Sequence, residues 1–130
     1  MKLNKEIVEK VRTSIYALPI ENQYKNLAYF SGWVINKPTI VKHDKTGKES
    51  VSLVIVQFMR NPNGYAHVKT FNLVSYIPSI IEQFKKQKKV CYIICDCQFQ
   101  WNTKLKQTYP SIYDMKIPFE IRELDLVEEK

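Results

Sequence analysis

Aromatic side chains and lysines are interleaved through the middle of this chain, a combination that can stack planar rings and neutralise anions. The 130 residues include 8 Tyr, 6 Phe and 2 Trp, with 20 Lys and Arg against 13 Asp and Glu. A base stacked on an aromatic side chain contributes about 1–3 kcal/mol, and each ammonium group can neutralise one phosphate. These residue types indicate a surface suited to the bases and phosphates of a nucleic acid.

The basic charge is concentrated in the central segment. Between Asn26 and Pro118 there are 13 Lys and Arg and 5 Asp and Glu, a net charge of +8, whereas the last twelve residues hold 5 acidic and 2 basic side chains. A single lysine is most often a solvated surface residue. The excess of basic over acidic residues within this segment is what favours an anionic partner.

Three cysteines and two histidines are the residues that would suit a transition metal. Cys91, Cys95 and Cys97 share the parity of one strand, where successive same-face residues lie roughly 6.6 Å apart, which is wide for sulfurs that share one zinc. His43 and His67 show no ligand spacing. We expect no metal and no cofactor, thiols packed as small apolar groups, and a reducing compartment, which makes the cytoplasm the expected location.

The sequence lacks the motifs of common catalytic sites. It has no phosphate-binding glycine loop and no histidine paired with a nucleophile, and Asp44, Asp96 and Asp114 are expected to be isolated from one another. No run approaches the roughly 18 apolar residues that span a bilayer, and the N-terminus lacks the apolar core of a signal peptide. We expect a binding protein rather than an enzyme, with no membrane partner.

An amphipathic helix is predicted before the central segment, from Asn4 to about Leu18. Asn4 is a suitable N-cap and Pro19 ends the helix. Its apolar residues recur at spacings of three and four, and they are Ile7, Val8, Val11, Ile15 and Leu18.

Five strands and one further helix are predicted in the rest of the chain. In the first strand, residues 27–34, successive side chains alternate between two faces, and we assign Ala28, Phe30, Gly32 and Val34 to the core. The other strands are expected at 51–58, 68–76, 90–101 and 115–127, the last with a kink near Arg122. Pro78 begins a helix whose Ile77, Ile80, Ile81 and Phe84 share one face.

This order predicts an all-β fold, a five-stranded OB-fold Greek-key barrel with a helix between strands 3 and 4 and an extra N-terminal helix. We divide the chain into an N-terminal helical extension, residues 1–25, and an OB-fold domain, residues 26–130. The second strand is apolar on both faces, so Val54, Val56 and Phe58 are expected to face outward, against a partner or a ligand.

Short motifs occur from residue 26 to about 127, among them Asn26, Gly32 and Pro38 in and beside the first strand, and Thr46-Gly47-Lys48 before Val51-Ser52-Leu53. These motifs resemble bacterial and phage single-stranded DNA-binding proteins, in the spacing of that family's opening strand and in its second strand with the preceding turn. The run from Asn72 to Tyr76 resembles the segment that leads into the family's helix. The resemblance implies a DNA-binding barrel with bases stacked near the end of the second strand and after the fourth.

The candidate contacts with nucleic acid are aromatic side chains on outward strand positions and basic side chains on flanking loops. Trp33, Phe58 and Trp101 are the leading stacking candidates. The others are Lys37, Lys42, Lys45, Lys48, Arg60, Tyr65, Lys69, Lys104, Lys106, Tyr109 and Tyr113.

Two features depart from the family and keep alternatives open. The chain stops without the family's long acidic tail, and a helix precedes the barrel. One alternative is an accessory subunit of a phage, plasmid or other mobile element that docks on a polymerase, primase or helicase and binds DNA weakly. Its partner contacts would be Ile7, Val11, Ile15, Val54 and Val56. An autonomous binder is instead expected to form a homo-oligomer, and an RNA-binding role stays open.

Overall fold

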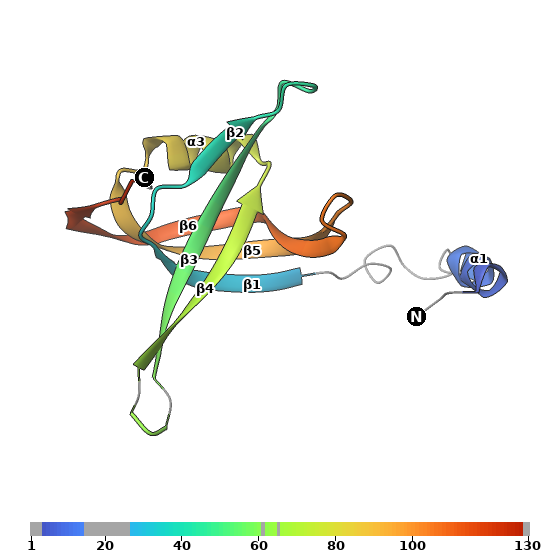
Figure 1. Cartoon of the computed structure of the whole chain (residues 1–130), viewed down its shortest axis with the longest axis horizontal. Coiled ribbons are helices and arrows are strands. Elements are labelled where there is room, and N and C mark those ends of the chain that lie inside the picture. The colour runs from blue at the N-terminus through green and yellow to red at the C-terminus, as the bar shows by residue number, and fades with distance from the viewer. Residues whose placement is uncertain (1–3, 15–26, 61, 65, 129–130) are drawn as a thin grey trace.

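The computed structural model describes residues 4–14, 27–60, 62–64 and 66–128 (Figure 1). Two helices and six strands follow one another along these residues. They are α1 (Lys5–Ser14), β1 (Leu27–Val34), β2 (Thr39–Lys42), β3 (Glu49–Arg60), β4 (Ala66–Ser75), α3 (Pro78–Lys86), β5 (Lys89–Asn102) and β6 (Gln107–Asp125).

Five of the strands close into a barrel. The order in the sheet is β1-β5-β6-β4-β3-β2, and an additional pairing of Trp33 with Val56 joins β1 to β3, which closes the ring and leaves β2 outside it. The β4–β6 pairing, at Val74 and Ser111, is parallel, and the other pairings are antiparallel. With α3 between β4 and β5, this confirms the predicted five-stranded OB-fold barrel with its helix between the third and fourth barrel strands.

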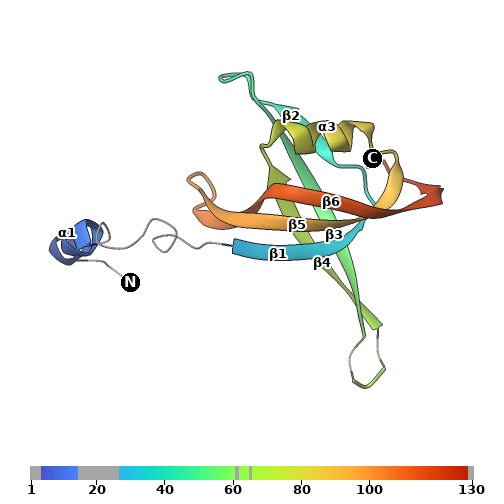
Figure 2. The same ribbon diagram turned by 180° about the vertical axis from the view of Figure 1, so that it is seen from behind.

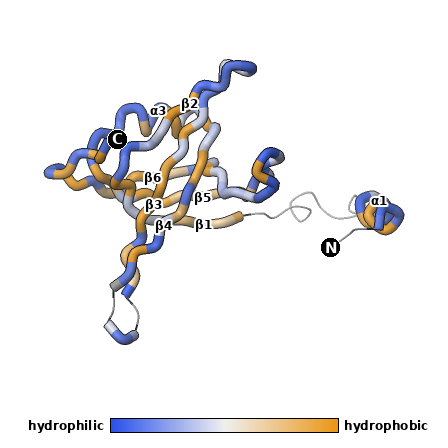
Figure 3. The backbone as a smooth tube through the Cα atoms, viewed as in Figure 1, coloured by the Kyte–Doolittle hydropathy of each residue, from blue (hydrophilic) through white to orange (hydrophobic). Residues whose placement is uncertain are grey.

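The barrel interior is filled by alternate residues of its strands, as the two-residue periodicity requires. Val34, Leu53, Ile55, Leu73 and Ile93 are buried, and Phe30 packs against them with its ring 5.4 Å from that of Phe71. The face predicted for α3 is confirmed, since its buried residues are Ile80, Ile81 and Phe84. Figure 3 shows the apolar residues along the barrel strands and hydrophilic residues at the β2–β3 turn.

Gly32 is required where β1 approaches β3. A Cβ at this position would lie 2.9 Å from the carbonyl oxygen of Val56 and 3.2 Å from the Cβ of Ile55. The first of these distances is shorter than any relaxed contact, and one of the two atoms is backbone, so a side chain here would push the strands apart. The close approach of the two strands therefore explains why the opening strand carries glycine at this point.

The three cysteines lie inside the barrel on β5, on the face shared with Ile93, as predicted. Burial is the main reason that the pKa of each thiol is raised, to about 11 for Cys91 and Cys97 and about 12 for Cys95. Among the described residues there is no group of three His, Cys, Asp or Glu side chains that could hold a metal ion.

We expect these thiols to be unreactive in the native protein and fully reactive after unfolding. The thiolate is the reactive form, and burial suppresses both its formation and its access to reagent. Titration with Ellman's reagent at pH 8 should give almost no fast reaction without denaturant and three equivalents in guanidinium. Because the unfolded thiols ionise near pH 9 while the folded ones keep their protons, stability should fall as the pH rises from about 9. A fast-reacting native thiol would contradict the closed barrel.

Two strands differ from the sequence prediction. β2 was not expected, because Pro38 and the polar residues after Lys42 mask its four-residue pairing with β3. β6 begins at Gln107 rather than near Met115, since Pro110 interrupts its pattern but is accommodated opposite Phe99. The predicted kink near Arg122 is confirmed by a shift in register, as Glu120 pairs with Cys91 and Asp125 with Lys89.

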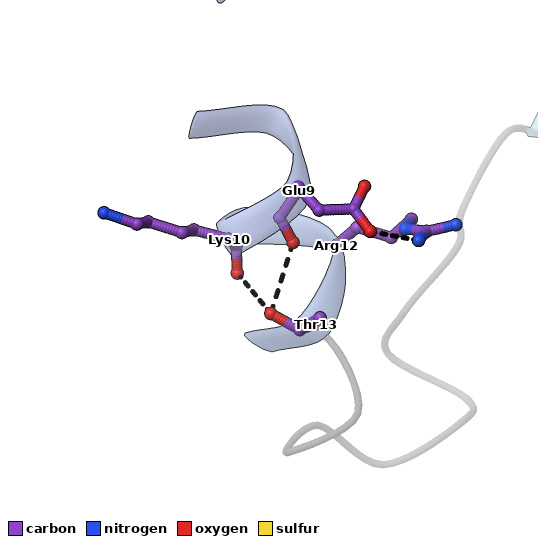
Figure 4. Close-up of polar contacts among 4 residues, drawn as sticks. All are labelled: Glu9, Lys10, Arg12 and Thr13. Atoms are coloured by element: carbon purple, nitrogen blue, oxygen red, sulfur yellow. Dashed lines mark hydrogen bonds and ion pairs between the residues drawn. The ribbon is translucent and has the colours of Figure 1, made fainter. Parts of the chain in front are cut away.

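Helix α1 lies apart from the barrel in both views, and none of its residues is buried (Figure 1, Figure 2). The Asn4 side chain accepts a hydrogen bond from the Ile7 N–H at 3.2 Å, which confirms the predicted cap. Near its end, Thr13 donates to the carbonyl oxygens of Glu9 and Lys10, and Arg12 pairs with Glu9 (Figure 4).

The apolar stripe of α1 has no cover from the described part of the barrel. Ile7 is 59% exposed, Val8 41% and Val11 64%. Ile15 and the predicted end at Leu18 and Pro19 lie outside the described residues. No helix among the described residues is both long and apolar enough to cross a bilayer.

Candidate nucleic-acid interface

The outer face of β3 and β4 is the centre of the candidate interface. Figure 1 looks onto these two strands, with the β2–β3 turn above them, the β3–β4 hairpin below and the β5–β6 turn to the right. Val54 and Val56 are half-buried on this face, opposite Asn72 and Thr70. The outward assignment of β3 is therefore confirmed, and the face carries an apolar strip between polar cross-strand partners.

Phe58 lies where the β3–β4 hairpin leaves the barrel. It pairs with Val68, and the two side chains are 64% and 58% exposed. Arg60 follows on the same side of the strand, whereas Lys69 pairs with Gln57 and lies on the opposite side of the hairpin. A ring this exposed, next to a guanidinium group, can stack on a base while the cation contacts the adjoining phosphate. Tyr65 lies outside the described residues.

Trp101 occupies the end of the β5–β6 hairpin and is 59% exposed. The turn that follows is held by the Asn102 side chain, whose Oδ1 accepts from the backbone N–H groups of Lys104 and Leu105 at 3.0 Å each. Lys106 adopts a positive φ of 51° in the same turn. The structure thus brings Trp101 together with Lys104 and Lys106, all of them exposed.

Three lysines lie together at the β2–β3 turn. Lys42 ends β2, and Lys45 and Lys48 lie in the turn before β3, all three exposed. His43 closes this turn, accepting from the Gly47 N–H at 2.7 Å through its carbonyl and donating its own N–H to Lys48 at 2.8 Å. The stacking candidates and the lysines therefore form three separate groups, on three hairpins, rather than one continuous site.

A row of rings, His43, Tyr76 and Tyr109, connects the β2–β3 turn with the β5–β6 hairpin. His43 and Tyr76 are not among the site residues predicted from the sequence. The rings of His43 and Tyr76 stack with centroids 6.3 Å apart, and Tyr76 is 47% exposed. Tyr109 follows on β6, where burial and then a hydrogen bond with Tyr76 raise its pKa to about 12. Tyr76 is the last residue of the predicted third strand, and that position is the signal that could have identified it. Tyr109 is thus linked through Tyr76 to the end of β4.

Two predicted residues lie elsewhere, and a third, Lys37, borders the β3–β4 face. Trp33 is half-buried on the outer face of β1, with its ring 5.3 Å from that of Tyr92. Lys37 forms an ion pair with Glu128 at 2.9 Å and lines a groove of about 340 Å³ together with Val54 and Asn72 of the β3–β4 face. Tyr113 is 39% exposed beside acidic side chains, and its pKa is raised, first by burial and then by Asp96.

The expectation that Asp96 and Asp114 are isolated is wrong. They are directly opposite each other on β5 and β6, and Asp96 is also opposite Tyr29 on β1. The sequence could not show this, because a bulge between Asp96 and Cys97 sets the register. Two like charges on this outer face would repel a phosphate, so the β1–β5–β6 side near Tyr113 is less suited to DNA than the β3–β4 side.

Comparisons with solved structures identify the architecture. The small single-stranded DNA-binding protein from Streptomyces coelicolor superposes with a TM-score of 0.52 at 12% identity, over 74% of this chain and 96% of that one. The mitochondrial single-stranded DNA-binding protein from S. cerevisiae gives a TM-score of 0.57 at 10% identity, over 75% and 97%. The chain has an OB-fold.

No protein-family model and no curated protein sequence matches the chain. At identities of 10–12% the two structures share the fold with this chain and do not assign its side chains a role. The functional argument therefore depends on the residues that the barrel exposes.

Proposed function

We propose that this protein binds single-stranded DNA across the outer face of β3 and β4, in DNA replication or recombination. The observation that carries the proposal is the exposure of Phe58 and Trp101 on two hairpins, each next to basic side chains, on a barrel with net positive charge. A large aromatic side chain left in water at a hairpin end adds nothing to the core, whereas it provides a plate for a base. We propose binding rather than catalysis, and a reducing compartment such as the cytoplasm suits the free thiols.

The fold supports this proposal. The two proteins compared above are single-stranded DNA-binding proteins by name, and they superpose on about three quarters of this chain. OB-folds bind oligonucleotides on the face of their second and third strands and on the loops at its ends, which here are β3, β4, the β2–β3 turn and the β5–β6 turn.

The first test is a titration with oligo-dT, followed by tryptophan fluorescence. We expect quenching with micromolar or tighter affinity at low salt, because Trp101 lies in the proposed site. If four to six of the basic side chains contact phosphates, the logarithm of the affinity should fall with that of salt at a slope of about −3 to −4, or roughly 100-fold between 50 and 200 mM. A flat titration at low salt would remove the proposal, and oligo-U in parallel compares RNA with DNA.

A second candidate function is an accessory subunit that docks on a polymerase, primase or helicase of a phage, plasmid or other mobile element. The observation that favours it is the uncovered apolar stripe of α1, with Ile7 and Val11 both more than half exposed. On this reading residues 1–25 are an extension that docks, and residues 26–130 are the barrel. An autonomous binder would instead form a homo-oligomer, which light scattering measures directly.

A further inference from the structure

A cleft opens on the outer surface where β1 and β3 separate. The two strands pair only at Trp33 and Val56, after which β1 continues beside β5 and β3 continues into the hairpin with β4. The cleft has a volume of about 360 Å³. This is at the lower end of the range for small-molecule sites, so it suits one small group rather than a peptide helix.

Aromatic side chains form part of the walls of the cleft. Trp33 and Tyr92 form one side, with rings in an edge-to-face arrangement at 5.3 Å and 63°, and Phe58 contributes to the other. Gly32 also lines the cleft, through its backbone. Flat apolar walls of this kind fit a planar, aromatic ligand.

A polar group also lines the cleft. The Gln57 amide donates from Nε2 to the carbonyl oxygen of Ser31 at 2.9 Å, which ties β3 to β1. This bond uses one N–H of the amide, so Gln57 can still offer a second donor and an acceptor. The edge of a nucleobase presents the complementary donor and acceptor groups.

Phe58 connects this cleft to the proposed DNA-binding face, since it lines the cleft and also pairs with Val68 on the β3–β4 hairpin. We propose that the cleft binds one nucleobase of the single strand, packed against Trp33 and hydrogen-bonded by Gln57, next to a base stacked at Phe58. This inference rests on the proposed function and adds to it a base-binding subsite off the β3–β4 face.

The test separates the subsite from DNA binding as such. In a Trp101→Phe variant Trp33 is the remaining tryptophan, since the chain has two. DNA binding is followed by the anisotropy of a labelled oligo-dT, and occupancy of the cleft by Trp33 emission. We expect Trp33 emission to fall along the same titration curve as the anisotropy rises. Anisotropy without any change at Trp33 would overturn the subsite and leave the proposed function standing, whereas no anisotropy change with either this variant or the wild-type protein would overturn both.

Substitution of Gln57 gives a second measurement. We expect Gln57→Met, which keeps the length of the side chain, to weaken oligo-dT binding about fivefold to tenfold, the loss of one hydrogen bond. Tyr29→Ala is the matched control, since Tyr29 is 73% exposed on the same outer side of β1 but does not line the cleft, and it should change the affinity less than twofold. Equal effects of the two variants would overturn the subsite. The subsite would also be overturned if Trp33 emission changed on dilution of the protein but not on addition of DNA, because a second copy of the chain would then cover the cleft.

Discussion

Replacing Phe58 and Trp101 together by alanine is expected to weaken oligo-dT binding by about 30-fold to 10,000-fold and to leave the barrel folded. Each ring is more than half exposed, so its removal costs little stability, and each is expected to stack on a base, at about 1–3 kcal/mol per base. The effects should be nearly additive, because the two rings lie on different hairpins. Fluorescence anisotropy with labelled oligo-dT measures the affinity, and circular dichroism monitors the fold.

The control for this pair is Phe119→Ala. Phe119 has almost the same exposure as Phe58, 65% against 64%, but it lies on β6 and does not line the cleft. If loss of any exposed aromatic side chain weakened binding non-specifically, Phe119→Ala would match the single Phe58→Ala variant. Unchanged affinity in the double variant, with an intact fold, would place the DNA elsewhere on the protein.

The barrel could be predicted from the sequence because its strands follow local rules. Ala28, Phe30, Gly32 and Val34 alternate with outward residues, and a two-residue period assigns them to the interior without knowledge of their neighbours. Pro78 and the apolar spacing after it define α3 equally well. Val54 and Val56 are expected on the outer face although their strand is apolar on both faces, and the burial of Leu53 and Ile55 beside the half-buried valines agrees.

The arrangement of the site could not be predicted in this way, because it depends on register and on contacts between distant segments. The Asp96–Asp114 pair follows from a bulge, and the His43–Tyr76 stack joins residues more than 30 positions apart. Lys37 was expected to be free for phosphate, yet the parallel bridge of Asn36 with Val127 brings Glu128 to it. Exposed ion pairs of this kind contribute little stability, so a phosphate could displace Glu128.

Leu73→Ala is expected to lower the free energy of unfolding by about 2–5 kcal/mol, a large share of the total for a domain of this size. Leu73 is fully buried on β4 opposite Leu53, and its removal leaves a cavity that neither strand can fill without breaking the ladder. Urea unfolding measures the change as a lower midpoint with the same slope.

Leu124→Ala, the same substitution at a side chain that is 50% exposed on β6, should cost less than 1 kcal/mol. Equal losses in the two variants would mean that the inward and outward faces are not those of a closed barrel. The proposed DNA-binding face would then lose its basis, because it consists of the side chains that the barrel directs outward.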